Sequence, residues 1–138
     1  MYKFATDEWL QAYKDAINSS SELAEAARDW QRDITLVVEA EPNKGVPIDL
    51  WGLFEVEHGK CKAATAVTPD VGDRAEYVIR APYSRWREII EGKLDPTRAL
   101  LQGKLQVKGD LKTLTQEVEA TRALVRAAAS IPTKFPDD

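Results

Sequence analysis

Apolar side chains recur at helical spacing near the start of the chain. Trp9, Tyr13 and Ile17 are four residues apart, so a helix would place them on one face. Asp7 and Glu8 come just before them, and their negative charges suit the N-terminus of a helix. The pattern predicts a first helix that starts near Asp7 and turns its aromatic stripe toward a core.

A serine-rich run predicts a second helix. In the segment Ser19–Glu22, a serine is followed three residues later by a glutamate, which fits a capping box. In that motif each of the two side chains bonds a backbone N–H at the start of the helix. We expect the helix that begins there to carry Leu23, Ala27 and Trp30.

From Ile34 the hydrophobic period shortens to two, which is typical of strands with one buried face. Turn residues such as Pro42–Gly45 and His58-Gly59 separate the alternating stretches. The predicted strands span residues 34–40, 48–57, 60–68 and 75–81. We expect the first three to form an antiparallel meander, with Leu53 and Phe54 on opposite faces.

The stretch GKLDPTRALLQGKLQVKGD, residues 92–110, ends and restarts elements in quick succession. Gly92 can end a helix in the left-handed conformation, and Asp95 can cap a short helix whose first position is Pro96. The predicted elements are a helix over residues 83–91, the short helix from Pro96 to Gly103, a fifth strand over residues 104–108 and a last helix from Leu111 to about Ser130. The glycines have neither the Walker spacing nor the GxGxxG spacing, so this is not a phosphate-binding loop.

With 138 residues the chain has the size of one ordinary domain, and we expect a single domain over residues 1–138. The composition is that of a globular fold, and the formal net charge is −4. This acidic balance argues against nucleic acid as a partner and disfavours an anionic membrane surface. Lys104 and Lys108 flank the neutral Gln106, so we interpret them as rim charges of an edge strand.

Several features bear on location. Cys61 is the only cysteine, which excludes an intrachain disulfide framework. The N-terminal stretch lacks the apolar core of a secretory signal, and the ending KFPDD is not a peroxisomal address. No apolar run approaches the roughly 20 residues that span a bilayer, so we expect no stable membrane insertion. These features predict a cytoplasmic protein.

Few residues are candidates for catalysis. Cys61 and His58 are close in sequence, but His58 falls in a turn and Cys61 in the strand after it, so they need not face one another. One imidazole and one thiol are also too few nitrogen and sulfur ligands for a typical transition-metal site. The acidic side chains on adjacent strands could form an acid pair, but we interpret them as solvated positions of the sheet; they are Glu39, Glu41, Glu55 and Glu57. We expect no catalytic residue, no metal site and no cofactor.

The second half of the chain resembles the sterol carrier protein 2 family. The resemblance is firmest over residues 75–138, where YVIRAPYSRWREIIEGKLDP leads to LLQGKLQVKGDLKTL. The pair G-K-L-D-P and Q-V-K-G-D at this separation is more specific than either motif alone. The ending IPTKFPDD is similar to the tail of prokaryotic members, while the first half agrees mainly in element order.

The resemblance implies an α/β fold in which helices cover a five-stranded, mainly antiparallel sheet and enclose an apolar tunnel. It implies a noncatalytic carrier for an apolar lipid, such as a fatty acid, a sterol-like molecule or an isoprenoid. Carried over by position, the expected wall residues are Leu53, Phe54, Trp86, Ile90, Leu101, Leu105, Val107, Leu124 and Val125. We expect a monomer or a weak dimer.

Two questions stay open at the level of sequence. The fold could instead serve an accessory protein that docks on a lipid-metabolising enzyme, with the cavity reduced or closed. The aromatic residues and the alanine-rich end of the last helix fit a solid core as well as a cavity wall, because both need buried apolar surface.

Overall fold

The structure, a computed structural model, describes all 138 residues and is built on a five-stranded sheet with the strand order β4-β3-β2-β5-β6. The elements are β1 (Tyr2–Lys3), α1 (Asp7–Asn18), α2 (Ser21–Ala26), β2 (Gln31–Glu39), η1 (Pro42–Lys44), β3 (Leu50–Glu57), β4 (Lys60–Ala66), α3 (Pro69–Gly72), β5 (Tyr77–Pro82), α4 (Tyr83–Ile90), α5 (Pro96–Leu101), β6 (Gln106–Lys108), α6 (Leu111–Gln116), α7 (Val118–Ala129) and β7 (Thr133–Lys134). The predicted α/β fold is confirmed.

β2 is the central strand of the sheet. It pairs antiparallel with β3 and parallel with β5, so that Ile34 lies between Phe54 and Tyr77. β3 pairs antiparallel with β4, and β5 with β6. The predicted meander of the first three strands is therefore confirmed. The β2–β5 pair is parallel because the chain crosses from the β4 edge, through α3, to the other side of β2.

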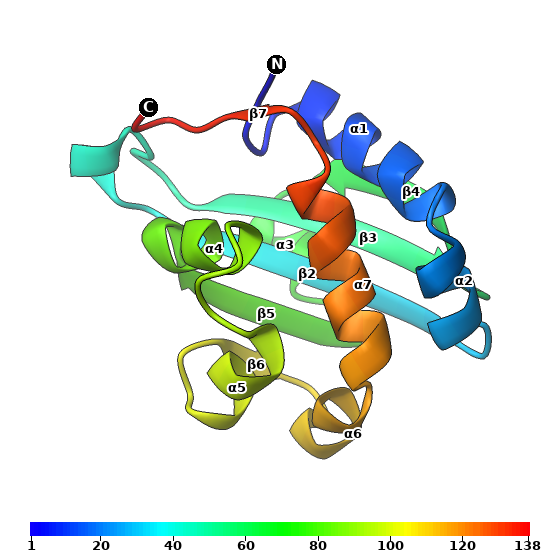
Figure 1. The fold of residues 1–138 in the computed structure, drawn as a ribbon. Coiled ribbons are helices and arrows are strands. Elements are labelled where there is room, and N and C mark those ends of the chain that lie inside the picture. The colour runs from blue at the N-terminus through cyan, green and yellow to red at the C-terminus, as the bar shows by residue number, and fades with distance from the viewer.

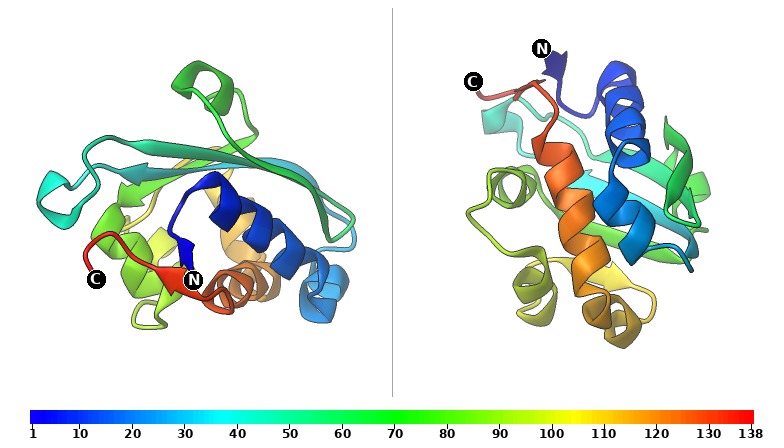
Figure 2. Two further views of the ribbon diagram at one scale, coloured as in Figure 1. Left: turned by 90° about the horizontal axis from the view of Figure 1, so that it is seen from above. Right: turned by 45° about the vertical axis from the view of Figure 1, so that its right-hand side comes forward.

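Most helices cover one face of the sheet (Figure 1). α7 crosses this face in front of the strands, with α1 on one side and α4 on the other. The view from above in Figure 2 places α3 on the opposite face. There the Thr35 hydroxyl donates a hydrogen bond to the Gly72 carbonyl of α3 at 2.7 Å. None of the helices is long and apolar enough to cross a membrane.

The last helix is broken, which the sequence pattern did not predict. α6 and α7 meet at Glu117, which has φ −93° and ψ +48°. The expectation of one helix from Leu111 to about Ser130 was wrong. The cause is a long-range contact, because the Glu117 carboxylate accepts hydrogen bonds from the side chains of Trp30 and Arg32 and so holds the chain at this point.

Smaller differences concern where elements begin and end. Ser20 is the N-cap of α2, and its hydroxyl accepts the Leu23 N–H at 3.1 Å, so the expected capping box with Glu22 is not formed. Trp30 lies beyond the end of α2, directly before β2. β3 starts later than expected and leaves Ile48 66% exposed. Neither α3 nor the short β1–β7 pair was predicted.

Two glycines with left-handed backbones differ in their surroundings. Gly59 and Gly103 have φ of +78° and +72°. A β-carbon on Gly59 would lie 2.7 Å from the Cα of Ala24 in α2, whereas one on Gly103 would meet nothing within 4 Å. The turn between β3 and β4 therefore packs directly on the α2 backbone.

We predict that Gly59→Ala destabilises the protein more than Gly103→Ala. The left-handed conformation costs either alanine about 1–2 kcal/mol. Displacement of the α2 backbone adds about 1–3 kcal/mol at Gly59 alone. Urea unfolding of both variants measures the two losses in free energy of unfolding. Equal losses would contradict the close contact between this turn and α2.

Candidate functional site

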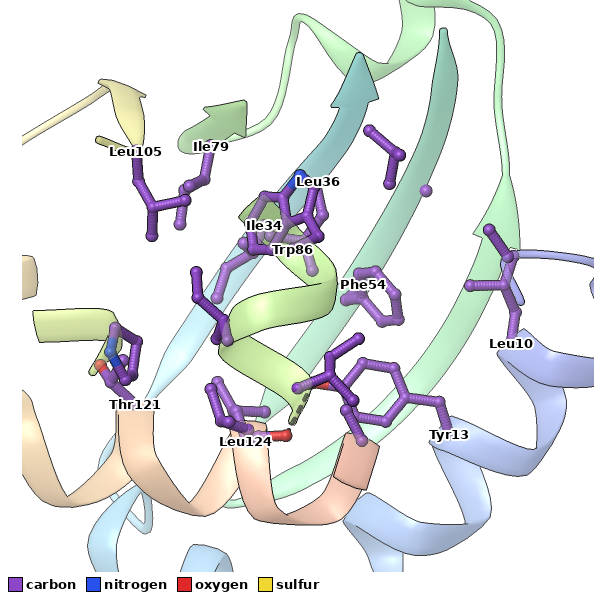
Figure 3. Close-up of a pocket in the computed structure, with 18 of the residues that line it drawn as sticks. Leu10, Tyr13, Ile34, Leu36, Phe54, Ile79, Trp86, Leu105, Thr121 and Leu124 are labelled. Atoms are coloured by element: carbon purple, nitrogen blue, oxygen red, sulfur yellow. Dashed lines mark hydrogen bonds between the residues drawn. The ribbon is translucent and has the colours of Figure 1, made fainter. Parts of the chain in front are cut away.

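An apolar cavity of about 150 Å³ lies between the helical face of the sheet and the helices α1, α4, α5 and α7. Of its 27 lining residues, 24 are hydrophobic. Figure 3 shows side chains from the sheet and from several helices converging on the same space, among them Ile34, Tyr13, Trp86 and Leu124. The cavity is the most distinctive chemical feature of the molecule, and it is built by segments far apart in sequence.

Strand alternation builds the wall on the side of the sheet. Successive side chains of a strand point to opposite faces, so Ile34 and Leu36 of β2 share the helical face. The β2–β3 register places Phe54 beside Ile34 on that face. Ile79 of β5 and Leu105, just before β6, extend this wall toward the other edge (Figure 3).

Helical spacing builds the facing wall. Leu10, Tyr13 and Ile17 are three or four residues apart on α1, and all three line the cavity. The same spacing joins Leu124 and Ala128 on α7. The apolar face of each helix therefore turns toward the sheet, as expected for an amphipathic helix on a hydrophobic layer.

The side-chain polar atoms of Tyr13, Trp86 and Thr121 in the wall are bonded within the protein. Tyr13 Oη donates to the Leu124 carbonyl at 2.9 Å, a bond drawn in Figure 3. Trp86 Nε1 donates to a backbone carbonyl of β2 at 2.9 Å, and the Thr121 hydroxyl donates to the Glu117 carbonyl at 2.8 Å. Burial raises the pKa of Tyr13 far above its usual value, so the phenol stays neutral. Such a wall favours an apolar occupant, because it presents few free hydrogen-bonding groups or charges to a charged ligand.

An ion pair holds the α6–α7 break against the sheet beside the cavity. Arg32 Nη2 and Trp30 Nε1 donate to the two carboxylate oxygens of Glu117 at 2.9 and 2.8 Å. The Arg32 guanidinium also lies over the rings of Trp30 and Tyr77, and 3.5 Å from a carboxylate oxygen of Glu76. The two carboxylates of Glu76 and Glu117 already outnumber the single charge of Arg32. We therefore assign this cluster a structural role and not the binding of an anion.

Six of the nine residues predicted for the tunnel wall line the cavity. They are Phe54, Trp86, Ile90, Leu105, Leu124 and Val125. The structure thus brings together side chains from β3, α4, the segment before β6, and α7. Contact of these residues with a lipid stays a prediction.

The other three predicted residues lie outside the cavity. Leu53 pairs with Thr35, whose side chain bonds α3, so it points to the opposite face of the sheet. Leu101 is 68% exposed, because α5 turns the neighbouring Leu100 inward instead. Val107, on the edge strand β6, packs partly buried against the core without lining the cavity.

The sequence reasoning did not assign the first helix to the wall. α1 contributes Trp9, Leu10, Tyr13 and Ile17 to the lining. The apolar stripe that predicted this helix was visible in the sequence and could have marked it as part of a cavity wall. The same stripe is typical of a solid core, so periodicity alone could not assign it to a cavity.

Cys61 and His58 have separate surroundings. Cys61 is buried, its Sγ donates to the Ala63 carbonyl, and burial raises the pKa of its thiol to about 11. The His58 side chain is 69% exposed, and its Nδ1 lies 3.1 Å from the Arg28 carbonyl. A buried thiol with a raised pKa is a weak nucleophile. These surroundings give no support to an enzyme built on this pair.

Three of the four candidate glutamates are engaged individually. Glu39 pairs with Arg80 at 3.2 Å, and Glu57 pairs with Lys62 at 3.0 Å. Glu41 accepts a backbone N–H from the start of α4 at 2.7 Å, and this bond holds the pKa of its carboxyl below the usual value. No group of three or more His, Cys, Asp or Glu side chains is placed to hold a metal ion.

Comparison with known proteins relates the chain to lipid carriers. Residues 10–121 match the model of the SCP-2 sterol transfer family. A crystal structure of a sterol carrier protein 2 is 32% identical to this chain, with 94% of this chain and 99% of the other covered and a TM-score of 0.85. A conserved hypothetical protein from Thermus thermophilus, described as possibly a sterol carrier protein, is 31% identical, with 97% and 93% covered and a TM-score of 0.85.

A more distant likeness concerns the fold alone. The sterol carrier protein domain 2 of Helicoverpa armigera is 21% identical, with 96% of this chain and 94% of the other covered and a TM-score of 0.60. No curated protein matches the chain.

We predict that Glu117→Ala lowers the free energy of unfolding by about 3 kcal/mol, because it leaves the largely buried Arg32 charge short of its nearest partner and Trp30 Nε1 without an acceptor. Glu119→Ala is the matched control. Glu119 is exposed in the first turn of α7 and should cost less than about 1 kcal/mol. Guanidinium unfolding of both variants tests the difference, and a small loss for both would show that the ion pair does not hold the break.

Cys61 gives a prediction on pH dependence. Its pKa of about 11, against an ordinary 9.0, lowers the thiolate fraction of the native protein at pH 8 by about 100-fold. Iodoacetamide should therefore label the native protein at least about 100-fold more slowly than the urea-unfolded chain. The native rate should rise about tenfold per pH unit until the pH nears the pKa. Mass spectrometry of timed samples measures both rates, and similar rates would contradict a buried thiol.

Proposed function

The chain belongs to the SCP-2 sterol transfer family, and from this membership we propose that it is a noncatalytic carrier that binds and transfers an apolar lipid in the cytoplasm. The observation that carries the proposal is the cavity of about 150 Å³, in which 24 of 27 lining residues are hydrophobic. The hydroxyl of Tyr13 and the indole N–H of Trp86 in its wall are paired within the protein, so an occupant is favoured by apolar contact. We propose a fatty acid, a sterol-like molecule or an isoprenoid as the lipid.

The size of the cavity bears on how the lipid is held. At about 24 cal/mol per Å³, an unfilled apolar space of 150 Å³ costs about 4 kcal/mol. That is a large part of a typical total stability of about 5–15 kcal/mol. Ligand pockets usually have at least about 300 Å³. We infer that the helices move outward when a lipid enters and that the cavity shrinks when it leaves.

The contacts of α4 and α7 favour an entrance between these two helices. Trp86 and Ile90 of α4 and Leu124 and Val125 of α7 line the cavity but are only partly buried. A ligand chain inside would be surrounded by apolar side chains, while its polar end would stay near water at this entrance. Each methylene removed from water contributes about 0.8 kcal/mol before the costs of association.

The docking role left open by the sequence needs a cavity that is reduced or closed. The cavity between the sheet and the helices favours the carrier, since nothing in the fold requires such a space for docking alone. A partner enzyme and the oligomeric state of monomer or weak dimer stay predictions. We also propose that residues 1–138 form a single domain, because segments far apart in the sequence build one cavity.

We predict that a long-chain lipid raises the melting temperature. A ligand at 100 times its dissociation constant stabilises by about 2.7 kcal/mol. For a chain of this size that is a rise of roughly 5–10 °C. Differential scanning fluorimetry with a fatty acid, a sterol and an isoprenoid alcohol measures the shift for each class. The carrier proposal fails if none of the three classes shifts the melting temperature.

A pair of neighbouring alanines tests the place of binding. Ala128 lines the cavity and is buried, whereas Ala129 is exposed at the end of α7. Ala128→Leu should fill part of the cavity and reduce lipid affinity by about tenfold or more, because the added side chain occupies the volume of several methylenes. Ala129→Leu should bind like the parent protein. Calorimetric titration of both variants would refute the cavity as the binding site if their affinities were equal.

A further inference from the structure

The hydrogen-bonding capacity of the cavity wall is one-sided. The lining residues that have a polar side-chain atom are Trp9, Tyr13, Trp30, Trp51, Trp86 and Thr121. Trp51 is set apart, because its ring lies on the opposite face of the sheet, where a β-carbon on Gly72 of α3 would come within 2.7 Å of it. The other five side chains decide which polar groups an occupant can meet.

These five side chains have donors that are all engaged. Each donor bonds within the protein at 2.8 to 2.9 Å: the indole N–H groups of Trp9, Trp30 and Trp86 and the hydroxyls of Tyr13 and Thr121. An indole nitrogen accepts no hydrogen bond, whereas a hydroxyl oxygen also has two acceptor lone pairs. No protein group donates to Tyr13 Oη or Thr121 Oγ1. The side chains of the wall therefore offer acceptors but no donor.

Thr121 is the acceptor closer to the proposed entrance between α4 and α7. It precedes Leu124 and Val125 by three and four residues, so it shares their side of α7. Thr121 is partly buried, whereas Tyr13 is only 6% exposed. In Figure 3, Thr121 and Tyr13 lie on either side of Leu124. A polar group that stays at the entrance therefore meets Thr121 and not Tyr13.

We propose that Thr121 Oγ1 selects a lipid whose polar end is a neutral hydroxyl, which donates a hydrogen bond to this oxygen. The threonine keeps its own proton on the Glu117 carbonyl and so acts only as an acceptor. The ligand class is a long-chain aliphatic alcohol with a straight or isoprenoid chain. A flexible chain can follow a narrow cavity of about 150 Å³ with less displacement of the helices than a rigid ring system.

Other polar ends fit this entrance less well. A ketone or an ether has only acceptors, so it finds no donor among the wall side chains after it leaves water. A carboxylate is charged at neutral pH, and none of the 27 lining residues carries a charge. Arg122, the next residue of α7, already pairs with Asp95 at 3.3 Å. The inference rests on the proposed carrier function, and it disfavours the fatty acid among the proposed ligands.

The test compares dodecyl alcohol with dodecyl methyl ether. Without a hydrogen bond from the ligand, the ether should bind more tightly, because it is more apolar and has no donor to desolvate. We expect the parent protein to bind the alcohol about 3- to 10-fold more tightly than the ether. Dodecanoate at neutral pH should bind more weakly than the alcohol. Titration calorimetry measures the dissociation constant of each ligand.

Thr121→Val removes the hydroxyl and keeps the branched shape of the side chain. The Glu117 carbonyl also accepts the Thr121 N–H at 3.0 Å, so the start of α7 keeps its backbone bond. The preference for the alcohol should disappear or reverse in this variant, and Thr121→Ser should retain it. Thr115→Val is the matched control, because the Thr115 hydroxyl also donates to a backbone carbonyl but does not line the cavity.

The ratio of the two affinities is the decisive quantity, since a general loss of stability would weaken alcohol and ether alike. An alcohol preference that Thr121→Val abolishes and Thr115→Val leaves unchanged supports the proposal. Equal or tighter binding of the ether by the parent protein overturns it. A preference that is lost in Tyr13→Phe but kept in Thr121→Val also overturns it, because the acceptor would then be the deeper hydroxyl.

Ala128→Leu separates this proposal from the carrier function. This variant fills part of the cavity and should weaken the binding of alcohol and ether alike. If it does so while the parent protein shows no alcohol preference, the carrier function stands and the selection by Thr121 fails. If the parent protein binds none of the three dodecyl ligands, both proposals fail.

Discussion

The register of the central strand determines what the rest of the molecule can do. Ile34 of β2 lies between Phe54 of β3 and Tyr77 of β5, and this pairing aligns the apolar positions of three strands on one face. If the pairing of β2 shifted by one residue, its apolar side chains would point to the opposite face of the sheet, where Thr35 bonds α3. The helices cover the sheet, and a cavity forms beneath them, because this alignment leaves one continuous hydrophobic face.

The helices over that face are fixed at their ends. Glu117 holds the start of α7 through Arg32 and Trp30. Beyond the other end of α7, Arg87 of α4 holds the C-terminal tail by donating hydrogen bonds to Asp137 and Asp138. Between these two anchors, α7 meets the cavity with Leu124, Val125 and Ala128. An outward shift of the middle of α7 would break the bond from Tyr13 Oη to the Leu124 carbonyl and the more exposed ion pairs of Arg122 with Asp95 and Arg126 with Glu22.

Local patterns in the sequence predicted most elements, because period, caps and turn residues are local signals. Asp95 caps α5 with its side chain, and Gly92 is left-handed, as the sequence indicated. The break at Glu117 was missed, since its cause lies 85 residues away in Arg32. Six of the nine wall residues expected from the family resemblance line the cavity, but the cavity itself could not be inferred from apolar spacing. A filled core and a hollow one require the same hydrophobic positions.

The short helix α5 explains why Leu101 lies outside the cavity wall. In six residues it turns Leu100 into the cavity and presents Arg98 and Leu101 to solvent. Adjacent leucines in a helix point about 100° apart, so they cannot both line one wall.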